Sequence, residues 1–279
     1  MRKKKAFWRA GLEGILFLAV AFVNLLPIVW GILTSFKGKR DLFAYPPKFF
    51  DFDFVLDNYK TIIEGGFGKT IINSILYSAF SIVIGLFLGM LAAYALQRYE
   101  FRGRKAVFYL VIGGIPLSIG SAALLIPNYI YMSSIGMLDK PFTLPILYAA
   151  YNLPMAVWIM KGGLEQVPVE IEEAAAIDGC SRAYIILRLV PRMNRTSMAS
   201  AALFIFIGAW NEFVVASVMI NSTELRTVQQ SIYNYMGFFG LDWGLLTAAA
   251  TLAVIPTIFI FCFLGKYMVS GVTAGSVKG

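Results

Sequence analysis

A series of long apolar stretches without any charged residue limits what this chain can fold into. Four such stretches lie between Lys69 and Arg98, between Lys105 and Asp139, between Lys140 and Lys161, and between Asp242 and Lys266. The shortest, residues 141 to 160, is still long enough, at about 1.5 Å per helical residue, to cross a hydrocarbon core of roughly 30 Å. The pattern predicts helices that span a membrane.

Two further stretches complete the set. Ile15–Leu33 is interrupted only by Asn24 and Pro27, and a segment from about Ser197 to Ile220 contains one acid, Glu212. The first stretch is longer than the core of a cleavable signal peptide and no small-residue cleavage site follows it. With 58% hydrophobic and 14% charged residues, the chain is too apolar for a soluble domain. We therefore predict an all-α, polytopic membrane protein with six transmembrane helices.

The basic residues indicate how these helices are oriented. With the amino terminus inside, the inner segments hold sixteen of the 24 Lys and Arg residues and the outer segments hold eight. Cytoplasmic loops of membrane proteins carry the excess of Lys and Arg. This bias, rather than nucleic-acid binding, explains the net charge of +8. We expect both termini and the long loop between the fourth and fifth transmembrane helices to be cytoplasmic.

The predicted organisation is a single transmembrane domain, residues 1–279, with its core at about 70–266. The parts are a first transmembrane helix (11–36), an extracytoplasmic segment (37–69), a cytoplasmic loop (162–196) and a cytoplasmic tail (267–279). The extracytoplasmic segment is either a small cap for a delivered binding protein or a passive connector. The tail is rich in glycine and shows no helical pattern, so by composition it is a flexible end.

The charged loop Val167–Arg192 stands out between the apolar segments. Pro168 suits the first turn of a helix, and Gly179 suits its end. Three acidic residues lie near the amino end, where the helix dipole favours negative charge: Glu170, Glu172 and Glu173. Three alanines follow, which would let the backbone of another protein approach closely.

A second helical pattern runs from Ser181 to Val190 and mixes basic with apolar residues, and Pro191 is expected to close it. The sequence therefore predicts two short helices joined at a glycine elbow, onto which a soluble protein could dock. The alternative is an amphipathic loop that lies on the membrane surface.

Three motifs give this chain a resemblance to a known family. Glu173-Ala174-Ala175, three residues and then Gly179 resemble the EAA loop of permease subunits in ATP-binding-cassette (ABC) importers. Trp210-Asn211-Glu212-Phe213 and the terminus Ser270–Gly279 resemble the MalG-like permeases of carbohydrate importers, the binding-protein-dependent transport system inner membrane components. The E-A-A-x-x-x-G pattern alone is common in helices. The order of all three motifs makes the resemblance specific, and the hydrophobic layout extends it over nearly the whole chain.

The resemblance implies a non-catalytic subunit of an ATP-driven oligosaccharide importer. Its partners would be a second, MalF-like permease, two ATPase subunits that bind ATP and Mg, and an extracytoplasmic sugar-binding protein; the chain itself would bind no cofactor. Coupling to the ATPase would use Glu172, Glu173, Ala174, Ala175, Asp178 and Gly179. Contacts of the tail with the ATPase would use Thr273, Ala274, Gly275 and Lys278.

One departure from the family pattern concerns Pro191. The family usually has a Leu-Pro pair one residue further from the loop glycine, whereas here Pro191 follows Val190. The resemblance therefore implies a slightly different angle at which the second short helix enters the membrane.

Asn211 and Glu212 are the most informative polar residues inside a predicted span, because a carboxylate in lipid normally faces protein or water. Either they line the sugar pathway, or they fix helix packing or a gate. Aromatic residues such as Tyr148 and Tyr151 could stack on sugar rings, although such residues more often belong to interfacial belts or packed interiors.

Other functions have less support in the sequence. The chain has no histidine, and its two cysteines, Cys180 and Cys262, lack the spacing of a metal site. We therefore predict no catalytic residue and no metal ligand, which disfavours a membrane-embedded enzyme. Gly65–Thr70 imitates a phosphate-binding loop, but Ile63 replaces the required first glycine. An ion-coupled secondary transporter remains the alternative, although only one buried acid is predicted.

Overall fold

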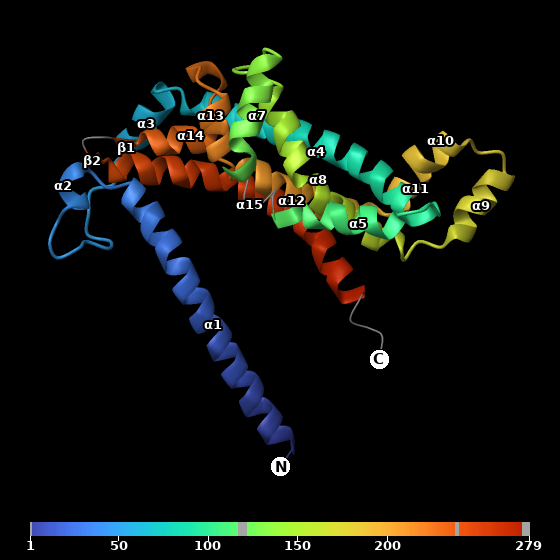
Figure 1. Cartoon of the computed structure of the whole chain (residues 1–279). Helices are drawn as coiled ribbons and strands as arrows, with labels where there is room; N and C mark the ends of the chain where they lie inside the picture. The colour runs from blue at the N-terminus through green and yellow to red at the C-terminus, as the bar shows by residue number, and fades with distance from the viewer. Residues whose placement is uncertain (1, 117–121, 238–239, 275–279) are drawn as a thin grey trace. The chain divides into compact units, whose positions relative to one another are not determined.

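The computed structural model describes residues 2–116, 122–237 and 240–274. The chain divides into two compact units, which are described separately. One comprises residues 1–67 and 232–255, and the other comprises residues 68–231 and 256–279. Figure 1 labels the helices along the chain.

The first unit holds the amino-terminal helix and the predicted extracytoplasmic segment. Its elements are α1 (Arg2–Ser35), α2 (Lys39–Leu42), α3 (Asp57–Glu64), the two-residue strands β1 (Met236–Gly237) and β2 (Gly240–Leu241), and the first part of α15 (Trp243–Ala274). Asn58 joins α3 to the end of α1, because its Nδ2 donates to the carbonyls of Ser35 at 2.9 Å and Lys37 at 3.1 Å. The Phe36 and Phe54 rings stack beside this joint, with centroids 4.3 Å apart.

Lys37 organises the loop that follows α1. Its ammonium group lies 4.0 Å from the centroid of the Trp30 ring and donates to the carbonyl of Lys48 at 2.6 Å. Only 2% of the residue is exposed, and burial lowers the pKa of this amine below its usual value. The segment after α1 is therefore folded onto the end of that helix.

The second unit is a helical bundle built around the pairing of α8 (Thr143–Leu164) with α12 (Arg195–Trp210). Small residues allow this close approach: a side chain at Gly208 would collide with Asn152, and one at Gly163 would collide with Ser197 and Asn194. Asn194 is itself 3% exposed and donates to the carbonyl of Met160 at 2.9 Å. The buried face of α4 (Phe67–Arg98) contributes Tyr77, Met90 and Tyr94 to the apolar core.

Four of the six predicted membrane spans correspond to single long helices in the structure. Among the described residues, four helices are long and apolar enough to cross a membrane: Glu13–Ser35, Phe67–Arg98, Thr143–Leu164 and Trp243–Gly265. These four match predicted spans. The other two predicted spans are not continuous helices.

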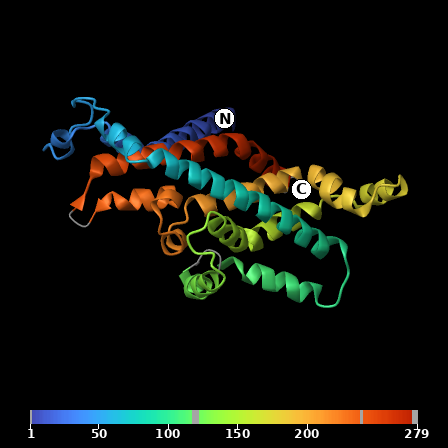
Figure 2. The same cartoon turned by 90° about the horizontal axis from the view of Figure 1, so that it is seen from above.

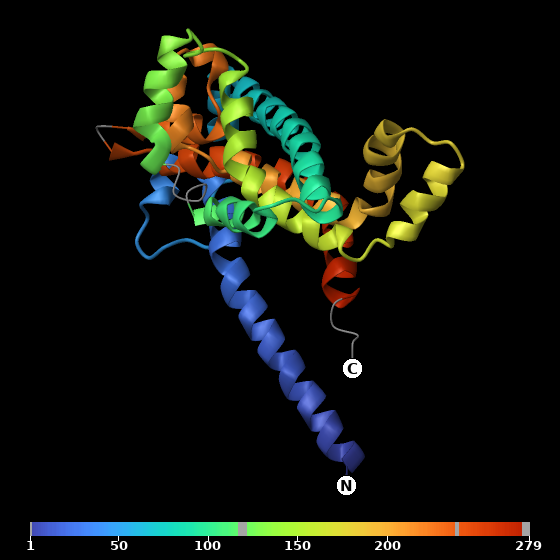
Figure 3. The ribbon, with the colours of Figure 1, turned by 45° about the vertical axis from the view of Figure 1, so that its right-hand side comes forward.

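The predicted span between Lys105 and Asp139 is divided into α5 (Arg104–Gly113) and α7 (Ala122–Ser134). Figures 2 and 3 show that these two helices run in different directions. The division begins at Gly114, where an added Cβ would lie 3.2 Å from a ring carbon of Pro154 in α8. α5 thus ends at a glycine pair that packs against a neighbouring helix, and residues 117–121 of this predicted span lie outside the described residues.

The predicted span 197–220 is also divided. α12 ends at Trp210 and α13 (Val214–Met219) begins after a break at residues 211–213. A 3₁₀ turn (Thr223–Leu225) and α14 (Val228–Asn234) follow. The break is stabilised by tertiary contacts, since Gln229 Nε2 donates to the carbonyl of Trp210 at 3.2 Å and Gln230 Nε2 donates to that of Ala216 at 3.1 Å.

The carboxyl end also differs from the expectation of a non-helical tail. α15 continues without interruption to Ala274 and so includes the first residues of the predicted tail. Glycine lowers helix propensity by only about 1 kcal/mol per residue, which an existing long helix can accommodate. The chain after Ala274 lies outside the described residues.

Candidate functional site

The loop predicted to dock a partner contains the helix α9 (Val169–Ile177). Pro168 is extended and precedes the helix, and Glu170 and Glu172 lie in its first turn. Gly179 has φ +84°, the left-handed conformation that glycine adopts most easily, and Cys180 N–H donates to the carbonyl of Ala175 at 3.0 Å. The predicted glycine elbow is confirmed.

The second half of the loop is longer than predicted. The short helix α10 (Arg182–Tyr184) continues through a π-helical turn (Ile185–Leu189) into α11 (Val190–Met193). Pro191 was expected to end this helix, but it lies inside the helical run. The π-helical turn stands directly before Pro191, whose ring and missing N–H are incompatible with regular α-helical bonding at this point.

Most of α9 is exposed. Glu173, Ala174, Asp178 and Gly179 are exposed, whereas Ala175 is half-buried against the core. Three apolar side chains are exposed beside them: Val169 at 43%, Ile171 at 46% and Ile177 at 86%. Figure 3 shows α9 and α10 at the outer end of the loop that joins α8 to α12. Such an apolar patch on a charged loop is typical of a protein-binding surface.

Glu172 differs from its neighbours and corrects one expectation. Its side chain is 8% exposed, and its carboxylate faces into the chain. Arg98 Nε donates to Oε1 at 2.8 Å, and the Tyr94 hydroxyl donates to Oε2 at 2.9 Å. The Glu172 side chain therefore does not belong to the exposed face that the sequence assigned to it, because two residues of α4 hold it.

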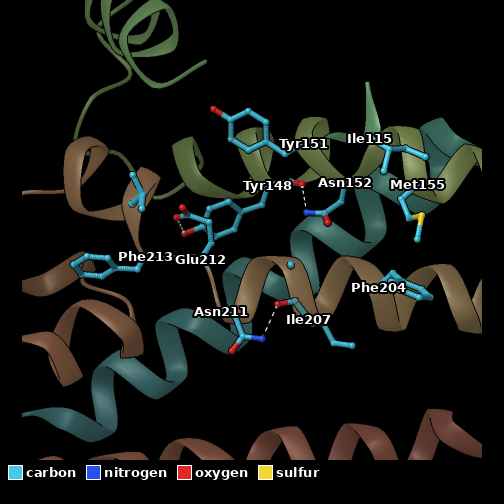
Figure 4. Close-up of a pocket in the computed structure, with 12 residues that line it drawn as sticks. Ile115, Tyr148, Tyr151, Asn152, Met155, Phe204, Ile207, Asn211, Glu212 and Phe213 are labelled. Atoms are coloured by element: carbon cyan, nitrogen blue, oxygen red, sulfur yellow. Dashed lines mark hydrogen bonds between the residues drawn. The ribbon is translucent and has the colours of Figure 1, made fainter. Parts of the chain in front are cut away.

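A cavity of about 500 Å³ lies between α8 and α12 in the second unit. Figure 4 shows its lining, which combines aromatic rings with amide and carboxylate groups. Tyr148, Tyr151 and Asn152 come from α8, and Asn211 and Glu212 lie at the break after α12. Both residues proposed from the sequence for a pathway or gate therefore line one cavity.

Glu212 explains the break between α12 and α13. Its Oε1 accepts a hydrogen bond from the backbone N–H of Val215 at 2.8 Å, and its Oε2 accepts one from that of Ala216 at 3.0 Å. The Tyr148 hydroxyl donates to Oε2 at 3.2 Å. The carboxylate thus satisfies the first turn of α13 and links it to α8. This geometry favours the packing interpretation of Glu212.

Asn211 is exposed to the cavity, and its Nδ2 donates to the carbonyl of Ile207 at 3.0 Å. Asn152, which the sequence interpretation missed, donates to the carbonyl of Tyr148 at 2.8 Å and packs against Gly208. No spacing pattern marks Asn152, because only the pairing of α8 with α12 brings it to the cavity.

The predicted tail contacts are only partly described. Thr273 and Ala274 belong to the last turn of α15, and Gly275 and Lys278 lie outside the described residues.

Comparison with known proteins identifies the chain. Residues 82–274 match the family model described as binding-protein-dependent transport system inner membrane component. The chain belongs to this family. It is therefore a multi-pass membrane permease, and the motifs from which the resemblance was drawn lie in the matched region up to Ala274.

Curated relatives cover almost the whole permease. It is 30% identical over 268 residues to the diacetylchitobiose uptake system permease protein DasC of Streptomyces coelicolor, covering 95% of this chain and 94% of the relative. It is also 30% identical over 268 residues to the trehalose/maltose transport system permease protein MalG of Thermococcus litoralis, covering 94% of both.

A solved structure confirms the fold. The permease matches a chain of a bacterial ABC transporter involved in the import of the acidic polysaccharide alginate with a TM-score of 0.80. The match covers 96% of this chain and 98% of that chain at 21% sequence identity.

We predict that Glu212→Ala lowers the stability of the permease by about 2 kcal/mol, because it leaves two backbone N–H groups and the Tyr148 hydroxyl without their charged acceptor. The measurement is the thermal unfolding midpoint of the detergent-solubilised protein. Tyr148→Phe removes only one of the three hydrogen bonds and should lower the midpoint less. Equal midpoints for wild type and Glu212→Ala would show that the carboxylate does not stabilise the break.

Proposed function

We propose that this permease is the transmembrane subunit of an ATP-driven, binding-protein-dependent carbohydrate importer, with oligosaccharides as substrates. The observation that carries the proposal is the loop around α9, a helix with an exposed alanine and apolar face beside a fixed glycine elbow. The names of two relatives support the substrate class, since they describe diacetylchitobiose uptake and trehalose/maltose transport.

The proposed complex contains this permease, a second MalF-like permease, two ATPase subunits and an extracytoplasmic sugar-binding protein. ATP and Mg bind to the ATPase subunits, and this chain binds no cofactor. ATP binding brings the ATPases together, which moves the docked loops and turns the permease pair outward to receive sugar. Hydrolysis then resets the pair.

The proposal also includes the number of membrane spans and the side of the membrane on which the termini and loops lie. Six spans arise when α5 with α7, and α12 with α13, each count as one interrupted span. Irregular backbone inside a membrane is tolerated where protein buries it or where it lines a water-filled cavity. The break at 211–213 meets this condition, because Asn211, Glu212 and Phe213 line the cavity. Both termini and α9 are then cytoplasmic, and residues 37–69 are extracytoplasmic.

On the cytoplasmic side, we assign contact with the ATPase to Glu173, Ala174, Asp178 and Gly179, with Ala175 at the edge of the contact. Their exposure in this chain supports the assignment. The cavity supports a pathway in which this permease contributes one wall, because a sugar needs aromatic surfaces and hydrogen-bonding groups together.

The test is reconstitution of the permease in proteoliposomes with the second permease, ATPase and binding protein encoded by the same organism. We expect uptake of radiolabelled maltose, trehalose or diacetylchitobiose that requires ATP and the binding protein. Uptake by the permease alone, driven by an ion gradient without ATP, would instead support a secondary transporter and contradict the proposal.

In the same assay we predict that deletion of residues 273–279 lowers the rate of ATP-dependent uptake at least tenfold, which corresponds to about 1.4 kcal/mol or more in activation free energy, while membrane insertion persists. The reason is that the proposed tail contacts, Thr273, Ala274, Gly275 and Lys278, would reach the ATPase subunits. The measurement is initial uptake rate per inserted permease. Wild-type uptake by the truncated permease would remove the tail from the proposed contact.

A further inference from the structure

A buried ion pair joins Arg98 of α4 to Glu172 in the loop around α9. Arg98, the last residue of α4, binds the loop at two points. Its Nε donates to Glu172 Oε1 at 2.8 Å, and its Nη2 donates to the carbonyl of Val167 at 2.8 Å. One guanidinium group therefore holds both the approach to α9 and its first turn.

Tyr94, one helical turn before Arg98, completes the contact. Its hydroxyl donates to Glu172 Oε2 at 2.9 Å, so both carboxylate oxygens of Glu172 bind residues on one face of α4. The side chains of Arg98 and Glu172 are each only 8% exposed. We name Tyr94, Arg98, Glu172 and the Val167 carbonyl the α4 latch.

The second half of the loop reaches the same end of α4. The Arg182 guanidinium lies 5.2 Å from the centroid of the Tyr99 ring, and the Tyr94 and Tyr99 rings meet edge to face at 6.1 Å. Interaction with the Tyr99 hydroxyl raises the pKa of Arg182. Buried Ile185 and Val190 pack against the core beneath.

Directional contacts of this kind fix the position of α9 relative to α4. An Arg fork that binds two acceptors sets both distance and orientation, and removal of one partner from a buried ion pair leaves an uncompensated charge. The exposed face of α9 is then free for a partner, while its inner face is fixed to a membrane helix.

We propose that Arg98 is a positioning residue that locks α9 to α4, so that displacement of α9 by a bound ATPase moves α4 directly. This inference rests on the proposed function, because it assumes that the ATPase binds α9. Beyond the proposed function, it identifies α4 as the helix that receives the motion and Arg98–Glu172 as the pair that transmits it.

The first experiment measures coupling in the reconstituted complex, as sugar molecules imported per ATP hydrolysed. Arg98→Lys keeps the charge but cannot bind two acceptors as a fork. We expect a roughly fivefold lower coupling ratio, with ATPase copurification within about twofold of wild type. The control, Arg102→Lys, makes the same exchange at an exposed position four residues further on and should leave the ratio unchanged.

Two results in that assay would overturn the inference. An unchanged coupling ratio in Arg98→Lys would show that the fork does not transmit motion. Loss of the ATPase from Arg98→Lys would show that the pair serves only to fold the loop. Failure of the proposed function is distinguishable from both, because it would appear in the wild-type complex as an absence of ATP-dependent uptake.

The second experiment needs no ATPase. A spin label at Ile177→Cys, with Cys180 and Cys262 replaced by Ala, reports the mobility of α9 in the detergent-solubilised permease. Arg98→Ala and Glu172→Ala should each raise the mobility of the label, and the double variant should raise it by less than the sum of the two, since both single variants remove the shared Arg98–Glu172 contact. Additive increases in the double variant, or none in the single variants, would contradict the latch.

Discussion

Ala174→Arg is expected to reduce the amount of ATPase subunit that copurifies with the permease roughly tenfold or more, a loss of about 1.4 kcal/mol or more in binding free energy. Ala174 lies on the exposed part of α9, where the small side chain would let the backbone of a partner approach. Arginine is a good helix former, so the substitution changes the surface and leaves α9 intact. The measurement is the stoichiometry of the affinity-purified complex.

The matched control for Ala174→Arg is Glu64→Arg. Glu64 is the exposed last residue of α3, in the segment that we assign to the extracytoplasmic side. We expect Glu64→Arg to leave the stoichiometry of the permease–ATPase complex unchanged. If both variants retain the ATPase in wild-type amounts, α9 is not the docking helix and the proposed function loses its main support.

Gly163→Ala should destabilise the permease by about 2 kcal/mol, because one methyl group must be forced into a fully packed contact between helices. The new Cβ would lie 2.6 Å from the Cβ of Ser197 and would also collide with Ser197 Oγ and Asn194 Oδ1. The measurement is the thermal unfolding midpoint in detergent. At this chain length, we expect a decrease of roughly 4–8 °C.

Gly162→Ala provides a control one residue away on the same helix. Nothing lies within 4 Å of a Cβ added there, and alanine has the higher helix propensity. Its unfolding midpoint should therefore equal or exceed that of wild type. Similar decreases for both variants would show that the two substitutions act through the helix backbone and not through the contact of α8 with α12.

The sequence was sufficient to predict features that depend on residues close together in the chain. Three of the four long uncharged stretches, together with Ile15–Leu33, became helices of membrane-spanning length, because apolar segments leave the backbone no better way to satisfy its hydrogen bonds in lipid. Gly179 ended α9 as predicted, because a left-handed residue closes a helix whatever surrounds it. The EAA loop, the motif around Asn211 and the terminal motif Ser270–Gly279 together predicted the family.

The predicted docking face needed one correction that no local rule could supply. Glu172 and Glu173 are adjacent acids with the same helix propensity, yet one is buried and the other is exposed. Glu172 meets Arg98, which lies 74 residues away in the sequence. Only the packing of α4 against the loop decides which acid faces a partner.

The sequence by itself therefore determined the long apolar segments, the glycine elbow, and the family to which the permease belongs. The tertiary structure alone decided the break at Glu212, whose carboxylate meets Tyr148 from 64 residues away, and the inward direction of Glu172. The physical reason is that helix formation depends on neighbours within a few residues. The partner of a buried charge, in contrast, is set by segments that meet only when the chain folds.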